Sequence, residues 1–188
     1  MARVAASRID FPTVMSPWHW RIAPRLALSA SPTASASSVE PGMNHDERAV
    51  AELIRHPAGL LALSDAGAHV DTLCDQGFTT YLLGHWVREL RALALEEAVR
   101  LVTSVPAERY GLHGRGRLAP GCAADLVLFD PARVAMRPTE MVYDLPRGQR
   151  RLLQRAEGIV EVLVNGTPVV ADGAPTGRRP GRVLRGGV

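Results

Sequence analysis

The feature that most limits the possible fold is a run of four apolar residues, Leu60 to Leu63, which ends directly at Ser64-Asp65. Ala58-Gly59 precedes the run. A short apolar run between such breakers is typical of a strand that is covered on both faces. Strands of this kind occur in parallel sheets whose faces carry helices. The sequence therefore predicts an α/β arrangement, with Asp65 at the end of the strand.

A helix is predicted just before this strand. Asn44 can cap it, and Glu47 stands three residues later, as in a capping box. The helix should end at His56-Pro57, because the residue before a proline is pushed out of helical conformations. Helix, turn and buried strand together form half of an α/β repeat.

A second helix is predicted after the strand. Its apolar residues recur at helical spacing, and Glu96 and Glu97 in its first turn favour the helix dipole. Pro106 either ends this helix or begins a new short turn. The apolar stripe consists of Leu95, Ala98, Val99, Val102 and Val105.

The chain is expected to have three parts. Residues 1–42 contain a Ser/Ala/Pro tract without a hydrophobic period, so we expect a disordered or non-homologous extension. Residues 43–115 carry the helix and strand pattern, and residues 116–188 are β-rich. In this last part Asn165-Gly166 joins two β-rich runs, which is the strongest short signal for a hairpin. Asp125–Asp130 is a further predicted strand.

Charge and composition exclude several classes of function. The net charge of +3 is Arg-dominated, but no zinc-finger spacing, aromatic RNA-binding motif or helix-turn-helix pattern accompanies it. No apolar run approaches the roughly 18 residues that a membrane helix needs. Cys74 and Cys122 form no CxxC motif. We therefore expect a cytoplasmic protein without nucleic-acid or membrane partners.

Asp65 is the leading candidate for chemistry. Burying a carboxylate at the end of a strand costs free energy unless a metal, a cation or hydrogen bonds compensate its charge. In α/β barrels the active sites lie at such strand ends. One interpretation is a metal ligand that also accepts the proton of a metal-bound water. The other is a cap, since Ser-Asp-Ala-Gly is also ordinary turn chemistry. The pattern alone leaves both interpretations open.

Three segments together carry a family resemblance. "LSDAGAHVD", "ALEEAVRLVTSVPAERYGL" and "GRLAPGCAADLVLFDPARV", in this order and spacing, resemble the C-terminal part of the amidohydrolase superfamily. The closing "VYDLPRGQRRLLQRAEGIVEVLVNGTPVVADGAPTGRRPGRVLRG" is similar to the D-aminoacylase (N-acyl-D-amino-acid deacylase) branch. The resemblance covers about residues 43–188.

The resemblance implies a metal-dependent hydrolase of linear amide C–N bonds, acting on small N-acyl amino acids. It implies a zinc-bearing (β/α)8 barrel followed by a small β-sandwich subdomain, of which this chain would hold the C-terminal portion. Asp65 would then be the catalytic carboxylate and a metal ligand. His69 would contact the substrate or support the site, although a loop histidine with a structural hydrogen bond is an equal alternative.

The histidines depart from the family's pattern. The family's early His-x-His is absent, and a catalytic zinc normally has three protein ligands. A complete barrel takes about 250 residues, whereas only residues 43–115 resemble barrel. We therefore expect that this chain alone neither retains zinc nor turns over substrate; the alternative is a non-catalytic interaction module that complements a separate barrel chain. The six histidines are His19, His45, His56, His69, His85 and His113.

Overall fold

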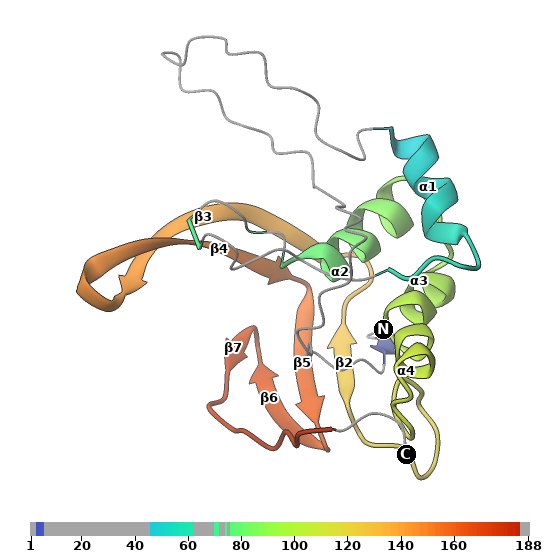
Figure 1. Cartoon of the computed structure of the whole chain (residues 1–188). Helices are drawn as coiled ribbons and strands as arrows, with labels where there is room; N and C mark the ends of the chain where they lie inside the picture. Colours follow the sequence, from blue (N-terminus) through green and yellow to red (C-terminus); the bar gives the residue numbers. More distant parts are fainter. Residues whose placement is uncertain (1–2, 6–45, 62–69, 72–73, 75, 185–188) are drawn as a thin grey trace.

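The structure is a computed structural model that describes residues 3–5, 46–61, 70–71, 74 and 76–184. These residues form an antiparallel sheet, a long two-stranded ribbon and a group of short helices (Figure 1). The fold is thus a small mixed α/β structure, and every strand pairing in its described part is antiparallel. The parallel strand predicted at Leu60–Leu63 stays a prediction, because Leu60 and Leu61 lie in no regular element and Ala62 and Leu63 lie outside the described residues.

The five-stranded sheet has the order β1-β2-β5-β6-β7. Its first strand comes from the N-terminal segment that the sequence predicts to be disordered; residues 6–42 of that segment lie outside the described ranges. A sandwich of two facing sheets stays a prediction. The strands are β1 (Arg3–Ala5), β2 (Leu126–Phe129), β5 (Ile159–Val164), β6 (Thr167–Ala171) and β7 (Ala174–Pro175).

The hairpin predicted at Asn165-Gly166 is confirmed, since these two residues form the turn between β5 and β6. Both have positive φ angles, 48° at Asn165 and 76° at Gly166. A two-residue turn of this type matches the right-handed twist of the flanking strands, which is why Asn-Gly favours it.

The ribbon consists of β3 (Ala135–Leu145) and β4 (Gln149–Glu157), joined by the short 3-10 turn η2 (Pro146–Gly148). It projects away from the rest of the described structure (Figure 1). The sequence pattern did not predict these two strands. Pro138 and the many charged residues hide the alternation, because they are rare in strands that are buried.

The helices lie on one side of the sheet (Figure 1). None of those in the described part of the chain is long and apolar enough to cross a bilayer. They are α1 (Glu47–Arg55), α2 (Phe78–Tyr81), the π-helix η1 (Leu82–Glu89), α3 (Leu95–Val102) and α4 (Ser104–Arg109).

Helix α1 ends where the sequence predicts and begins with a different cap. His56 takes an extended conformation before Pro57 and closes the helix. At the other end Asp46 is the capping residue, and its side chain accepts hydrogen bonds from the backbone N–H groups of Arg48 and Ala49. Asn44, the predicted cap, lies outside the described residues.

The second predicted helix is divided in two. The chain breaks at Thr103, whose φ and ψ of −127° and −85° are not helical, so α3 ends before Pro106. Pro106 lies instead in the first turn of α4, where its missing N–H is tolerated. The expected stripe faces the core: Ala98 is buried, and Leu95, Val99 and Val102 pack against the buried cluster. Leu101, which the stripe did not include, is buried as well.

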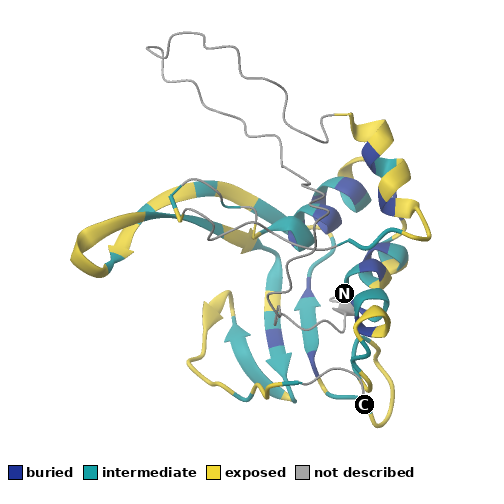
Figure 2. Cartoon of the chain, in the orientation of Figure 1, coloured by how far each residue is buried: buried dark blue, intermediate teal, exposed yellow. Residues whose placement is uncertain are grey.

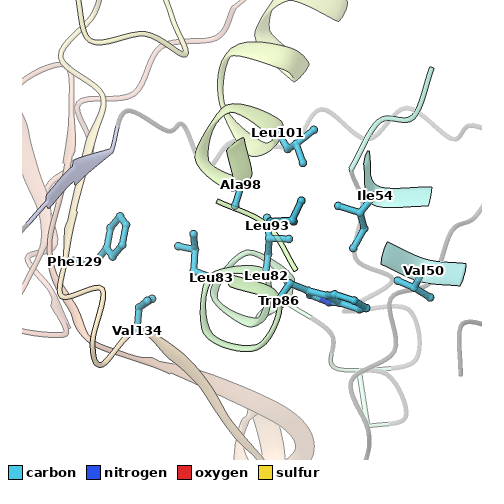
Figure 3. Close-up of a cluster of buried hydrophobic side chains, with 10 residues drawn as sticks. All are labelled: Val50, Ile54, Leu82, Leu83, Trp86, Leu93, Ala98, Leu101, Phe129 and Val134. Atoms are coloured by element: carbon cyan, nitrogen blue, oxygen red, sulfur yellow. The ribbon is translucent and has the colours of Figure 1, made fainter. Parts of the chain in front are cut away.

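The core joins the helices to the sheet. Trp86 of η1 lies between α1 and α3, and Phe129 of β2 packs from the opposite side (Figure 3). The buried positions therefore concentrate on the inner sides of the helices, while the distal ribbon is exposed (Figure 2). The cluster contains Val50, Ile54, Leu82, Leu83, Trp86, Leu93, Ala98, Leu101, Phe129 and Val134.

Candidate active-site segment

The residues on either side of the segment that carries the candidate residues contact the rest of the fold. Asp65 and His69 themselves lie outside the described residues, and so do all positions from 62 to 69. Leu61, before this segment, packs against the helical core. Val70 and Asp71, after it, contact strand β4. Leu152 pairs with Met141 halfway along the ribbon, so the chain after this segment contacts the middle of the ribbon.

Two bonds from β4 hold the residues that follow His69. The backbone N–H of Leu152 donates to the carbonyl oxygen of Val70 at 2.8 Å. Nε and Nη2 of Arg150 both lie 2.9 Å from Oδ2 of Asp71. Such a pair is worth little by itself when exposed, but here it lies next to a backbone bond. No sequence pattern predicted this contact, because 79 residues separate Arg150 from Asp71.

The same side of the ribbon holds the start of α2. The backbone N–H of Gly77 donates to Oε1 of Gln154 at 3.0 Å. A Cβ at Gly77 would lie only 2.5 Å from Cγ of Met136 in β3, so the backbone passes close to the ribbon here. Residues 70–77 are thus tied to the ribbon at both ends.

Three of the six histidines, His56, His85 and His113, lie in the described part of the chain. Nδ1 of His85 lies 2.9 Å from Oε2 of Glu89, and its Nε2 lies 3.0 Å from Oε1 of Glu47. Nδ1 of His56 accepts from the backbone N–H of Ala58 in the turn after α1. His113 follows α4 in a turn, where its backbone N–H donates to the carbonyl of Gly111.

These residues do not fit a zinc ion. No group of three or more His, Cys, Asp or Glu side chains within the described ranges is arranged to hold a metal. His85 has both ring nitrogens engaged by carboxylates, so neither is open to a metal. A catalytic zinc needs three protein ligands, and the described part of the chain does not supply them.

Asp125 is a buried carboxylate with a structural role. It is 3% exposed, and its Oδ2 accepts from Nη1 of Arg115. Its Oδ1 accepts from the backbone N–H of Asn165 at 2.8 Å. Because both oxygens are engaged, Asp125 joins the start of β2 to the β5–β6 turn and is not available for catalysis.

One carboxylate on the ribbon has a shifted pKa. Asp144 receives hydrogen bonds from Nε and Nη2 of Arg151, at 2.6 and 2.7 Å. This hydrogen bonding lowers the pKa of Asp144 and raises that of Arg151. Asp144 is exposed and Arg151 is half-buried, and the pair lies near the turn of the ribbon.

Known proteins provide a direct comparison. A model of the family described as "Amidohydrolase family" matches residues 15–170, so the match begins inside the segment expected to be non-homologous. D-aminoacylase of Alcaligenes xylosoxydans xylosoxydans is 47% identical over 103 residues, 55% of this chain and 19% of that protein. N-acyl-D-glutamate deacylase of the same organism is 45% identical over 109 residues, 58% of this chain and 20% of that protein.

Solved structures of such deacylases are also similar to this chain. A D-aminoacylase mutant in complex with CuCl2 has a TM-score of 0.44 and 40% identity, over 56% of this chain and 20% of that one. N-acyl-D-glutamate deacylase from Bordetella bronchiseptica, complexed with zinc and a phosphonate inhibitor, has a TM-score of 0.35 and 39% identity, over 51% and 19%. The chain spans about a fifth of the length of the curated relatives it matches. Because the family match covers most of its residues, the chain belongs to the amidohydrolase family.

Proposed function

We propose that this chain supplies the Asp65-bearing part of an N-acyl-D-amino-acid deacylase, an amidohydrolase that cleaves linear amide C–N bonds. The observation that carries this proposal is the identity of 45–47% to D-aminoacylase and to N-acyl-D-glutamate deacylase. The substrates would be small N-acyl-D-amino acids, and the protein would act in the cytoplasm.

Asp65 has the central role in the proposed reaction. Water adds to the amide carbonyl, and the Asp65 carboxylate accepts the proton that the water loses. The same carboxyl then delivers this proton to the departing amine nitrogen as the C–N bond breaks. The products are a carboxylic acid and a free amino acid. His69 would contact the substrate or orient its neighbours.

In this proposal the complete enzyme binds the metal, whereas this chain alone does not. A phosphonate complex of one similar deacylase contains zinc, and a similar D-aminoacylase has a binuclear metal centre. Asp65 would contribute one ligand. The described residues of this chain add no group of three, so we propose that the chain alone retains no zinc and has no turnover.

A second candidate function is a non-catalytic module that completes a barrel supplied by a separate chain. This second candidate is favoured by the fact that the chain spans only about a fifth of the length of its relatives. The apolar side chains exposed on the β3–β4 ribbon favour it too.

The deciding experiment uses a chimaera. In Alcaligenes D-aminoacylase the matching 103-residue segment is replaced by the residues of this chain. We expect the zinc-loaded chimaera to hydrolyse N-acetyl-D-amino acids, and we expect the purified chain alone to release no amino acid above background. A soluble, zinc-bound chimaera without activity contradicts the proposed function. Hydrolysis by the chain alone, lost in Asp65→Asn, contradicts the inactivity of the isolated chain.

A further inference from the structure

The turn between β5 and β6 contains a chemically reactive sequence, Asn165-Gly166. The backbone nitrogen of a glycine can attack the side-chain amide carbon of a preceding asparagine, because glycine has no side chain to hinder the approach. Asparagine is accordingly among the heat-labile residues of proteins. The chain has one other asparagine, Asn44, and His45 follows it. Asn165 is therefore the position where the sequence most favours spontaneous deamidation.

Three hydrogen bonds hold this turn. The backbone N–H of Asn165 donates to Oδ1 of the buried Asp125 at 2.8 Å. The backbone N–H of Gly166 donates to the carbonyl oxygen of Ala124, also at 2.8 Å. The side chain of Asn165 donates from Nδ2 to the carbonyl oxygen of Pro180 at 2.8 Å. The attacking nitrogen and the reacting amide are thus both engaged.

The next turn along the chain has the same backbone conformation in a more open setting. Asp172-Gly173, between β6 and β7, has φ angles of 50° and 77°, against 48° and 76° at Asn165-Gly166. Asp172 and Gly173 are both exposed, and nothing lies within 4 Å of a Cβ at Gly173. Asn165 is half-buried, where the C-terminal segment passes beside the end of β5 (Figure 1). The contacts of Asn165, rather than its backbone conformation, therefore distinguish the two turns.

We infer that Asn165 is a deamidation site that the C-terminal segment, residues 177–184, keeps closed. When the turn opens, the Gly166 nitrogen loses its proton to solvent base and forms a bond to Cγ of Asn165. The side-chain amide nitrogen takes up a proton and leaves as ammonia. Water then opens the cyclic imide at either carbonyl carbon, which leaves aspartate or isoaspartate. The inference does not depend on the proposed deacylase function.

The product of this reaction cannot restore the closed turn. The Asn165 amide donates to Pro180, whereas a carboxylate at this position only accepts. The new carboxylate also adds a negative charge beside Asp125, whose Oδ1 accepts from the N–H of the same residue. Both effects favour release of the C-terminal segment, so the modification acts in one direction.

The test follows deamidation by mass spectrometry in mildly alkaline buffer, with isoaspartate located by peptide sequencing. A chain of residues 1–179 lacks the Pro180 carbonyl. We expect Asn165 to deamidate about two- to tenfold faster in it than in the full chain, the factor for the loss of one hydrogen bond. A chain of residues 1–184 keeps Pro180 and is the matched control, with the rate of the full chain. Isomerisation of Asp172 reports general loosening of the sheet and should be equal in all three.

A second measurement uses the full-length chain. Asn165→Asp reproduces the product of the reaction, and we expect trypsin to cut after Arg178 or Arg182 about two- to tenfold faster than in the wild type, because cutting follows the population of the open segment. Asn44→Asp makes the same chemical change elsewhere in the chain and should leave the cutting rate unchanged.

The opposite outcomes contradict the inference. Equal rates at Asn165 in the full chain and in residues 1–179 would show that the Pro180 contact does not protect it. A parallel rise at Asp172 would assign the protection to the sheet as a whole. Equal cutting of Asn165→Asp and the wild type would show that the product does not release the segment. Absence of isoaspartate at Asn165 even in the urea-unfolded chain would show that the turn is not a deamidation site.

Discussion

The backbone N–H of Leu152 donates to the carbonyl oxygen of Val70 at 2.8 Å, and Val70 is the residue immediately after His69. The outer edge of β4 is thus bonded to the chain at the end of the candidate active-site segment. Arg150 strengthens the same contact through Asp71. The first half of β4 therefore holds the residues that follow this segment.

This contact predicts a pattern of hydrogen exchange. The amide of Leu152 should be protected in the wild-type chain, because its hydrogen is bonded to Val70 rather than to water. Arg150→Ala should increase its exchange rate while the amides of β5 keep theirs. Arg155→Ala is the control, since Arg155 is another β4 arginine and pairs with Glu140 of β3 rather than with Asp71. Equal exchange of Leu152 in the wild type and in Arg150→Ala would mean that the ion pair does not support the backbone bond.

Asp125 is predicted to be a main support of the sheet. Asp125→Ala leaves Arg115 without its buried partner and removes the acceptor of the Asn165 N–H, so unfolding free energy should fall by roughly 3–5 kcal/mol. Urea denaturation measures this loss. Glu108→Ala removes an exposed pair with Arg117 and should cost less than about 1 kcal/mol. Similar losses in the two variants would contradict the assigned role of Asp125.

Gly158 and Gly173 form a matched pair. Both have positive φ, 74° and 77°, so an alanine at either costs about 1–2 kcal/mol of backbone energy. At Gly158 a Cβ would also lie 2.5 Å from the backbone nitrogen of Val134, whereas at Gly173 nothing lies within 4 Å. Gly158→Ala should therefore lower the melting temperature clearly more than Gly173→Ala does. Equal shifts would show that the chain at Val134 moves aside without cost.

The Asp144–Arg151 pair predicts a pH effect on the ribbon. The hydrogen bonds from Arg151 lower the pKa of Asp144 below its usual value of 3.8. A group with a lowered folded pKa stabilises the fold above its unfolded value, and this contribution is lost as the pH falls through the folded pKa. Arg151→Gln should therefore raise the pKa of Asp144 toward 3.8, as measured by NMR titration of its carboxyl carbon. An unchanged titration curve would mean that the pair does not persist in solution.

Local signals predicted the elements that depend on neighbouring residues. His56-Pro57 ends α1, and Asn165-Gly166 forms its hairpin, because both effects act within a few residues of the chain. The strands of the ribbon were missed because their stability depends on pairing between distant positions. The sequence did not predict the division between α3 and α4, because the spacing of apolar residues does not show that the backbone of Thr103 is non-helical.

The sequence predicted which residues could form the site but not which residues lie near them. Asp65 and His69 lie outside the described residues, so their roles stay predictions. Arg150 and Leu152 were not foreseen near them, since a contact across 79 residues leaves no trace in spacing or composition. Long-range side-chain contacts such as that of His85 with Glu47 are hidden for the same reason.

The proposed role of Asp65 is decided by the effect of Asp65→Asn on kcat/KM for an N-acetyl-D-amino acid, measured in the zinc-loaded chimaera with D-aminoacylase. Asparagine keeps the size of the side chain but cannot accept and return a proton, so we predict a loss of about a hundredfold or more. Asp144→Asn, at an exposed position near the turn of the ribbon, should leave kcat/KM unchanged. Activity that survives in Asp65→Asn would contradict the proposed reaction, because the carboxylate would then have no part in it.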